Sequence, residues 1–145
     1  MPVRSARTAW TGSLPEGSGQ VELLSSRIAT YEVSFPKRSA EQADGTTSPE
    51  ELIAAAHSAC YAMQFSALAA AAGGTPNNVD VTADVRLSPD PAGGLRISDI
   101  HLTVRGTVDG LDAEAFAKVA ADTKVQCPVS KALTGTNITL DAQPA

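Results

Sequence analysis

The run SPEELIAAAHSACYAMQFSALAAAA, residues 48–72, decides the fold, because it predicts a single long helix. Ser48 can cap the first turn, Pro49 suits the first helical position, and Glu51 follows the cap at the spacing of a capping box. Gly73-Gly74 then ends the helix. Apolar residues continue all round this helix, which is typical of a helix at the centre of a protein rather than on its surface.

The same run raises the question of a membrane span. Residues 52–72 carry no formal charge, and a bilayer span needs about 20 apolar residues. However, most of these residues are alanine, and the run holds few Leu, Ile or Phe side chains to drive insertion. His57, Gln64 and two serines add polar groups. We therefore expect a helix buried within a soluble protein.

Strand patterns flank this helix on both sides, because apolar and polar residues alternate there. The predicted strands cover residues 3–10, 21–23 and 29–35 before the helix, and 79–87, 95–104 and 138–142 after it. The alternation slips by one residue between Ile97 and Ile100, which predicts a β-bulge. Residues 37–47 are polar and predict a loop.

A second helix is predicted from Asp112, which can cap it, to about Gln126. It must end there, because the residue before Pro128 is pushed out of helical geometry. A short turn over residues 129–133 precedes the last strand. The order of strands, helix, hairpin, helix and strand predicts one α+β domain over residues 1–145.

The composition argues against several classes of protein. With 145 residues and 43% hydrophobic side chains, the chain can form one domain with a real core. A formal net charge of -5 and the lack of any Lys or Arg run argue against nucleic-acid binding. Two cysteines without a CxxC motif are too few for a secreted disulfide scaffold, and residues 1–7 lack the apolar stretch of a signal peptide. We therefore expect a cytoplasmic protein.

The two cysteines, Cys60 and Cys127, are each open to two interpretations. A free cysteine is often a small buried core residue. A reactive cysteine needs its thiolate, and the macrodipole gives little help at Cys60 in the middle of a helix. Activation would require a cation brought in by the tertiary structure. Cys127 precedes Pro128, so it can cap a short helix whose amides point at its sulfur.

His57 lies three residues before Cys60 and has three interpretations: a core histidine, a base for Cys60, or half of a metal pair. Together with His101, the histidines and cysteines could supply four zinc ligands, but their spacing matches no compact zinc module. A base for Cys60 would make the chain a cysteine hydrolase, which would have no need of Cys127.

Two motifs carry a resemblance to a known family. They are TSPEELIAAAHSAC at residues 47–60 and CPVS at residues 127–130. With the order of strands and helices, they resemble the osmotically inducible and organic hydroperoxide resistance proteins, the OsmC/Ohr family. The resemblance implies antiparallel sheets wrapped around a long central helix in an intertwined homodimer. The glycine-rich arginine motif of the Ohr branch is absent, which places the chain nearer the OsmC branch.

The resemblance also implies a mechanism and its residues. Cys60 matches the peroxidatic cysteine, which attacks an organic hydroperoxide and becomes a sulfenic acid, with hydrogen peroxide as a second candidate substrate. Cys127 matches the resolving cysteine, which forms a disulfide with it. A dithiol reductant, in this family often a dihydrolipoyl group, restores both thiols, and no metal or other cofactor is implied. The implied role is defence against oxidative and osmotic stress.

Glu50 matches the family's conserved acid, and Arg38 is the expected arginine beside the thiolate, with Arg27 as the alternative. A carboxylate can hold a guanidinium through a bidentate pair. Ten residues of helix rise about 15 Å, so Glu50 cannot serve the Cys60 of its own chain directly. In an antiparallel pair of central helices, Glu50 of one protomer would approach Cys60 of its partner.

An apolar wall could favour organic hydroperoxides, and three residues are expected to contribute: Met63, Phe65 and Phe116. Core packing explains these side chains equally well. A rival function within the same fold is a non-enzymatic, stress-induced ligand-binding dimer whose thiols are inert.

Overall fold

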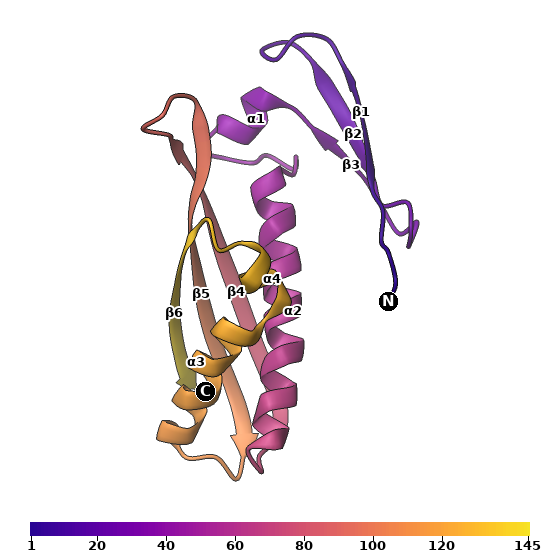
Figure 1. The fold of residues 1–145 in the computed structure, drawn as a ribbon. Helices are drawn as coiled ribbons and strands as arrows, with labels where there is room; N and C mark the ends of the chain where they lie inside the picture. The colour runs from indigo at the N-terminus through magenta and orange to yellow at the C-terminus, as the bar shows by residue number, and fades with distance from the viewer. The chain divides into compact units, whose positions relative to one another are not determined.

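The computed structural model describes residues 1–145, which form two compact units, Met1–Leu52 and Ile53–Ala145. Each unit contains one three-stranded sheet (Figure 1). The α+β class predicted from the sequence is confirmed, with a long helix between the two sheets in chain order. The boundary between the units falls inside that helix, near its first turn.

The first unit is an antiparallel sheet followed by a short helix. Its strands β1 (Arg7–Thr11), β2 (Ser18–Glu22) and β3 (Thr30–Val33) lie in the order β1-β2-β3. Strands were predicted in all three places.

Helix α1 (Phe35–Ser39) was not predicted, because the sequence pattern continued the third strand to residue 35 and began a loop at residue 37. The Ser34 hydroxyl accepts a hydrogen bond from the Lys37 amide, and Pro36 stands in the first turn, so local capping starts a helix there.

The long helix α2 (Pro49–Ala71) has nearly the predicted bounds. The Glu51 amide donates to the Ser48 hydroxyl at 3.2 Å, which is one half of the expected capping box. The other half is absent, because the Glu51 carboxylate accepts instead from the Thr47 hydroxyl at 2.6 Å. Gly73 ends the helix with a φ of 87°, a left-handed conformation that favours glycine.

The second unit contains the larger sheet, built from β4 (Thr75–Pro89), β5 (Leu95–Asp109) and β6 (Asn137–Pro144). Strands β4 and β5 form an antiparallel hairpin, and the predicted bulge is confirmed, because the register shifts between Arg86 and Leu87 opposite the segment from Ile97 to Asp99. Strand β6 pairs with β5 in parallel, so the expectation of purely antiparallel sheets is wrong at this strand. Two helices between β5 and β6 carry the chain back along the sheet, which a parallel pairing requires.

Helices α3 (Ala113–Gln126) and α4 (Pro128–Ala132) form this crossover. The Asp112 carboxylate accepts from the Ala115 amide at 2.8 Å, as a cap should. Cys127 ends α3 and is the N-cap of α4, with Pro128 in the first helical position. The helix break predicted before Pro128 is confirmed.

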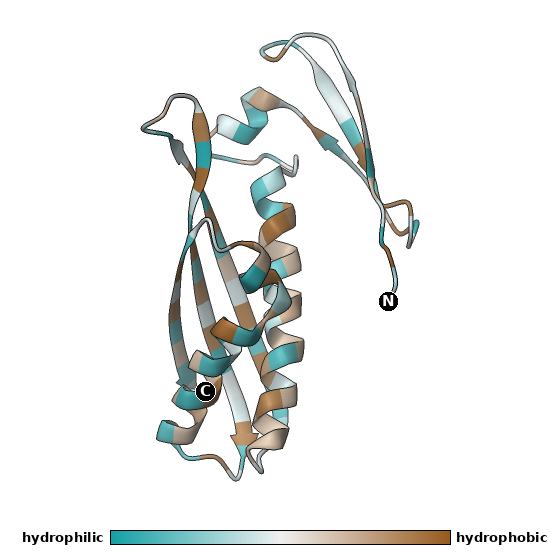
Figure 2. Ribbon diagram, viewed as in Figure 1, coloured by the Kyte–Doolittle hydropathy of each residue, from teal (hydrophilic) through white to brown (hydrophobic).

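Both long helices pack on one core with the sheet of the second unit. One face of α2 contributes Tyr61, Phe65 and Ala69, α3 contributes Phe116 and Ala120, and alternate residues of β5 complete the core: Ile100, Leu102 and Val104. By length and hydropathy alone α2 could also cross a membrane, but Tyr61, Phe65 and Ala69 are fully buried here. Figure 2 shows the weakly apolar, alanine-rich character of α2 beside the more strongly apolar strand segments.

Candidate active site

The two sulfur atoms of the chain meet in the second unit. Cys127 Sγ lies 3.1 Å from Cys60 Sγ, with one thiol hydrogen bond between them. Both cysteines are free thiols, and a disulfide needs about 2.05 Å, so a shift of about 1 Å would join them. Cys60 is partly exposed, whereas Cys127 is fully buried. Cys60 is therefore the sulfur that an incoming molecule can reach.

Two buried hydrogen bonds fix α2 against the crossover helices on either side of Cys60. The Tyr61 hydroxyl donates to the Ala120 carbonyl of α3 at 2.7 Å. His57 Nε2 lies 2.7 Å from the Ser130 hydroxyl of α4. Because these bonds bracket Cys60 in sequence, they hold its sulfur at the junction of α3 and α4, where Cys127 stands.

Cys127 sits among hydrogen-bond donors. Burial alone would raise the pKa of its thiol, but the Ser130 amide, Cys60, the Ser130 hydroxyl and the Val129 amide beside the sulfur lower the pKa overall. The amides belong to the first turn of α4. The prediction that Cys127 caps a short helix is confirmed, and amides of that helix lower the pKa of its thiol, but its sulfur accepts no capping hydrogen bond.

Cys60 has the opposite balance. Burial raises the pKa of its thiol, one hydrogen bond from the Val129 amide lowers it, and the neighbouring Cys127 raises it further. No cation is among these causes. The second unit by itself therefore leaves Cys60 a poor nucleophile, and a positive charge must come from elsewhere if Cys60 is to react as a thiolate.

The first unit holds an arginine fixed by a carboxylate. Arg38 Nη2 donates to Glu50 Oε1 at 2.7 Å, and Arg38 Nε lies 3.1 Å from each carboxylate oxygen. Glu50 is only 8% exposed, whereas the Arg38 side chain is 31% exposed, so the carboxylate is buried and the guanidinium stays partly accessible. The structure thus brings together the two residues that the sequence singled out as acid and arginine. Arg27, the alternative arginine, is exposed in the turn before β3.

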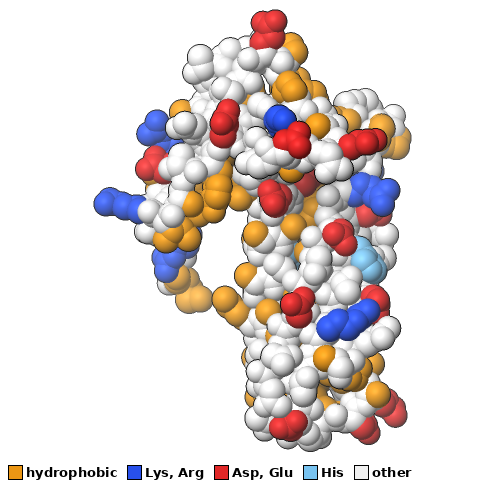
Figure 3. Space-filling model, turned by 180° about the vertical axis from the view of Figure 1, so that it is seen from behind, with side chains coloured by type: hydrophobic (Ala, Val, Ile, Leu, Met, Phe, Trp, Pro, Cys, Tyr) orange, Lys and Arg blue, Asp and Glu red, His pale blue; other side chains and the backbone are white.

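Arg38 also borders a small apolar pocket of about 120 Å³ within the first unit. Trp10, Leu14, Phe35 and Pro49 supply most of its apolar lining. A cation at the edge of an apolar hollow can bind a polar oxygen while the hollow holds a hydrocarbon group. On the face shown in Figure 3, Lys and Arg side chains are scattered among acidic ones, without a basic patch.

The side chains proposed as zinc ligands do not gather into a metal site, because no cluster of three or more His, Cys, Asp or Glu residues is present. His57 bonds to Ser130, and His101 Nδ1 bonds to the Thr139 hydroxyl at 2.7 Å on the sheet. The same geometry weakens the hydrolase interpretation, because neither ring nitrogen of His57 bonds to Cys60: Nε2 bonds to Ser130 and Nδ1 has no hydrogen-bond partner.

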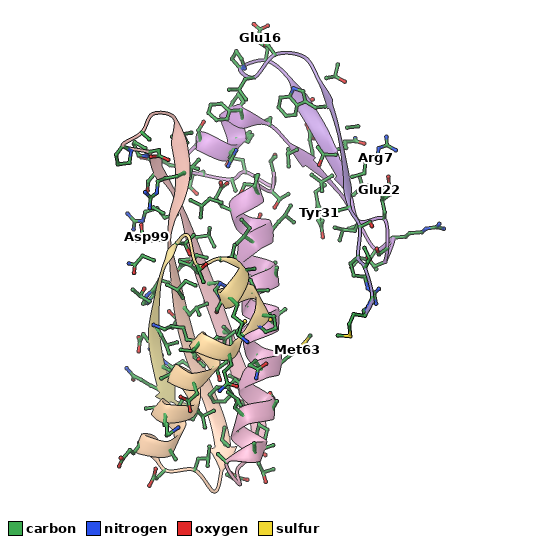
Figure 4. All side chains as sticks on the ribbon, in the orientation of Figure 1. Arg7, Glu16, Glu22, Tyr31, Met63 and Asp99 are labelled. Atoms are coloured by element: carbon green, nitrogen blue, oxygen red, sulfur yellow. The ribbon has the colours of Figure 1, made fainter.

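The three side chains expected to form an apolar wall lie in different environments. Phe65 and Phe116 are buried against each other with ring centroids 5.1 Å apart, so both belong to the core. Their burial argues against contact with a substrate. Met63 is 74% exposed and points outward from α2, as Figure 4 shows. It therefore remains the only one of the three that is accessible.

Met63 belongs to an apolar stripe along the exposed side of α2. All members of this stripe are exposed, and all but Met63 are alanine: Ala55, Ala56, Ala59, Met63, Ala67 and Ala70. Their spacing of one, three or four residues places them on one side of the helix. Such small side chains allow another helix to approach closely, so α2 is apolar on a side that a single chain leaves uncovered.

The sequence indicated Ser130 only as the last residue of the CPVS motif, without a role of its own, although it bonds to His57 and lowers the pKa of the Cys127 thiol. The contact with His57 joins residues separated by 73 positions, so no local pattern could have indicated it.

Comparisons relate the whole chain to known proteins. The family model described as OsmC-like protein matches residues 42–142. Peroxiredoxin OsmC from Escherichia coli K12 is 37% identical over 140 residues, which cover 97% of this chain and 95% of that protein. An organic hydroperoxide resistance protein from Elizabethkingia anophelis has a similar structure, with a TM-score of 0.78, 23% identity and 99% of each chain covered. OhrB of Bacillus subtilis gives a TM-score of 0.73 at 24% identity, covering 96% of this chain and 98% of that one.

Proposed function

From the premise that this chain belongs to the OsmC-like protein family, we propose that it reduces organic hydroperoxides through Cys60 and Cys127. The activity is that of a thiol-dependent peroxidase of the peroxiredoxin type, which the curated relative supports. The observation that carries the assignment of residues is the distance of 3.1 Å between Cys60 Sγ and Cys127 Sγ. Inert thiols would have no need of this contact, so it favours the enzyme over a non-enzymatic ligand-binding dimer.

The proposed reaction has two steps. The Cys60 thiolate attacks the outer oxygen of the hydroperoxide, the O–O bond breaks, an alcohol leaves, and Cys60 becomes a sulfenic acid. Cys127 then attacks the Cys60 sulfur, the S–O bond breaks, and water leaves as the disulfide forms. The partial exposure of Cys60 and the burial of Cys127 support this division of roles, because the peroxide meets Cys60 first.

Arg38 and Glu50 are proposed to activate Cys60. Burial raises the pKa of the Cys60 thiol, so the proposed mechanism needs a cation next to the sulfur. The bidentate pair with Glu50 holds the Arg38 guanidinium in one orientation, with its remaining N–H groups free to donate to sulfur and peroxide oxygen.

A homodimer is proposed to complete the site. The stripe of exposed small apolar residues on α2 suits antiparallel contact with α2 of a second copy. In that arrangement, Glu50 and Arg38 of one protomer approach Cys60 of the other, which the rise along one helix would otherwise prevent.

The substrate is proposed to be a hydroperoxide with an apolar group, and hydrogen peroxide is a second candidate. The apolar pocket beside Arg38, about 120 Å³ in volume, has room for part of a hydrocarbon chain. This preference agrees with the Elizabethkingia relative, whose name records resistance to organic hydroperoxides.

The catalytic cycle relies on the cysteine pair rather than on a prosthetic group, as in the peroxiredoxin relative. We propose that a dithiol such as a dihydrolipoyl group returns the disulfide to thiols, because a neighbouring second thiol makes the exchange intramolecular. We also propose a cytoplasmic location, where both thiols are kept reduced between cycles, and a single functional domain over residues 1–145. The 97% coverage by a single relative supports that domain.

Two cysteine variants test the proposal. We expect Cys60→Ser to abolish the consumption of cumene hydroperoxide in the presence of dihydrolipoamide. Cys127→Ser should consume one equivalent of peroxide and then stop, with a sulfenic acid that dimedone traps on Cys60. Full turnover by Cys60→Ser would overturn the proposed function.

A further inference from the structure

One buried polar pair has no role in the proposed mechanism so far. His57 and Ser130 are joined at 2.7 Å, and they are 0% and 4% exposed, respectively. Ser130 stands in the first turn of α4, directly after its N-cap Cys127, and its hydroxyl is among the groups that lower the pKa of the buried Cys127 thiol. A buried polar path thus runs from His57 of α2 through Ser130 toward the sulfur of Cys127. Polar side chains are costly to bury, so a polar path toward a reactive sulfur calls for a functional explanation.

The direction of this path follows from His57. Burial lowers the pKa of its imidazole, so the ring is neutral at neutral pH and carries one N–H group. Nδ1 is buried and has no hydrogen-bond partner. An unpartnered buried N–H group is rarer and costlier than an unpartnered lone pair, which places the hydrogen on Nε2. His57 therefore donates to the Ser130 oxygen.

A serine hydroxyl has one hydrogen to donate. With its oxygen already accepting from His57 Nε2, the hydroxyl has that hydrogen free to turn toward Cys127 Sγ. We propose that His57 is a positioning residue for the resolving step, because its hydrogen bond orients the Ser130 hydroxyl toward the Cys127 sulfur, where the hydroxyl stabilises the charge of the attacking sulfur. This inference rests on the proposed function, in which Cys127 resolves the sulfenic acid of Cys60.

In the resolving step, Cys127 gives up its proton and its sulfur attacks the Cys60 sulfur. A sulfur–sulfur bond forms, and the S–O bond of the sulfenic acid breaks. The proton joins the leaving hydroxide to give water, Cys127 is oxidised, and the sulfenic acid is reduced to the disulfide level. The hydroxyl of Ser130 stabilises the negative charge on Cys127 before the attack, when the charge is greatest.

The other groups near Cys127 do not orient the Ser130 hydroxyl. Cys60 and Tyr61 are the titratable side chains that face it from α2, and the Tyr61 hydroxyl donates to the Ala120 carbonyl instead. Lys124 and Lys131 line a surface pocket beside Ser130, and Lys124 Nζ lies 3.3 Å from the Ile138 carbonyl. Of these groups, His57 is the one that bonds to the Ser130 hydroxyl.

Two substitutions of His57 distinguish its hydrogen bond to Ser130 from its contribution to the packing of the core. In His57→Gln, the side-chain amide nitrogen can occupy the position of Nε2 and donate to Ser130. In His57→Asn, the shorter amide reaches only the position of Nδ1 and cannot donate to Ser130. Ser130→Ala removes the hydroxyl itself, with the loss of a single oxygen atom.

The titration is carried out in a Cys60→Ser background, in which Cys127 is the only thiol and its ionisation is read from the ultraviolet absorbance of the thiolate. We expect Ser130→Ala and His57→Asn to raise the pKa of Cys127 by roughly one unit each, the loss of one hydrogen bond to a charged group. His57→Gln should stay near the parent value. The double variant Ser130→Ala/His57→Asn should match either single one, because the residues act in series.

An unchanged Cys127 pKa in Ser130→Ala would overturn the inference. A raised Cys127 pKa in Ser130→Ala would also overturn it if a folded His57→Asn variant kept the parent's Cys127 pKa. Should His57→Asn fail to fold, Ser130→Ala alone decides. With both cysteines present, mass spectrometry after rapid mixing with peroxide should show normal sulfenic acid formation in His57→Asn but disulfide formation slowed by roughly tenfold. Failure of the proposed function appears differently, as no oxidation of Cys60 in the unsubstituted protein.

Discussion

Cys127 Sγ and Cys60 Sγ lie 3.1 Å apart, although 67 positions separate them in the sequence. The contact exists because a break between α3 and α4 places Cys127 at the same level as the middle of α2. Cys60 is the more accessible sulfur, while Cys127 has the more favourable hydrogen bonds for a thiolate. The second unit therefore favours ionisation of Cys127 over Cys60, and in the proposed mechanism the activation of Cys60 depends on Arg38 and Glu50.

Replacement of Arg38 tests that dependence. We expect Arg38→Ala to lower kcat/KM for cumene hydroperoxide on the order of 100-fold, as the loss of a fixed charged donor does in other enzymes. Arg38→Lys should recover only part of this, because an ammonium cannot form the bidentate pair with Glu50. Lys37→Ala is the matched control, since Lys37 pairs with the exposed Asp44. Equal rates for Arg38→Ala and Lys37→Ala would exclude Arg38 from the site.

A charge on the exposed stripe of α2 tests the homodimer. Met63→Glu should give a monomer by sedimentation or light scattering, because a carboxylate would be buried in the helix–helix contact. The peroxidase activity should fall with it, since in the proposed homodimer each site takes residues from both protomers. Leu95→Glu, at an exposed apolar residue of the hairpin between β4 and β5, should change neither property. A fully active Met63→Glu monomer would contradict the shared site.

Phe65 separates core packing from substrate binding. Phe65 is fully buried between Tyr61 and Phe116, so Phe65→Leu should lower the free energy of unfolding by about 1–2 kcal/mol. Urea denaturation measures this loss. The KM for cumene hydroperoxide should stay the same, because the ring does not reach the surface. A raised KM without a loss of stability would restore Phe65 as part of an apolar wall for the substrate.

The lowered pKa of His57 predicts a dependence of stability on pH. The unfolded chain binds a proton at this histidine near its ordinary value of 6.5, whereas the folded protein does so only at lower pH. Between these two values the unfolded state holds more protons, so the free energy of unfolding falls as the pH falls, by at most about 1.4 kcal/mol per pH unit for one proton. Urea unfolding should be measured between about pH 7.5 and about pH 5, on either side of the ordinary histidine pKa. The free energy of unfolding should decline less in His57→Gln than in the parent protein.

Local chemistry made much of this fold predictable. Asp112 caps α3, Gly73 ends α2, and the slip after Ile97 marks a bulge, because each of these features depends on residues adjacent in sequence. The parallel pairing of β6 with β5 was missed, since it depends on the path of two helices across the sheet.

The candidate site was likewise predictable from the sequence only in part. The bidentate contact of Arg38 with Glu50 agrees with the prediction from the family motif. The burial of Phe65 and Phe116 was not fixed by their spacing, because apolar residues serve a core and a binding wall alike. The contact of His57 with Ser130 comes only from the packing of α2 on α4.

The pairing of the two sulfurs under peroxide is the most direct test of the whole account. The reduced protein would be titrated with cumene hydroperoxide without reductant, and its intact mass and peptide map followed. We predict the loss of two hydrogens (about 2 Da) at one equivalent of peroxide, with a single disulfide between Cys60 and Cys127, as expected for neighbouring thiols. An unchanged mass, or a stable sulfinic acid on Cys60 with Cys127 still a free thiol, would contradict it.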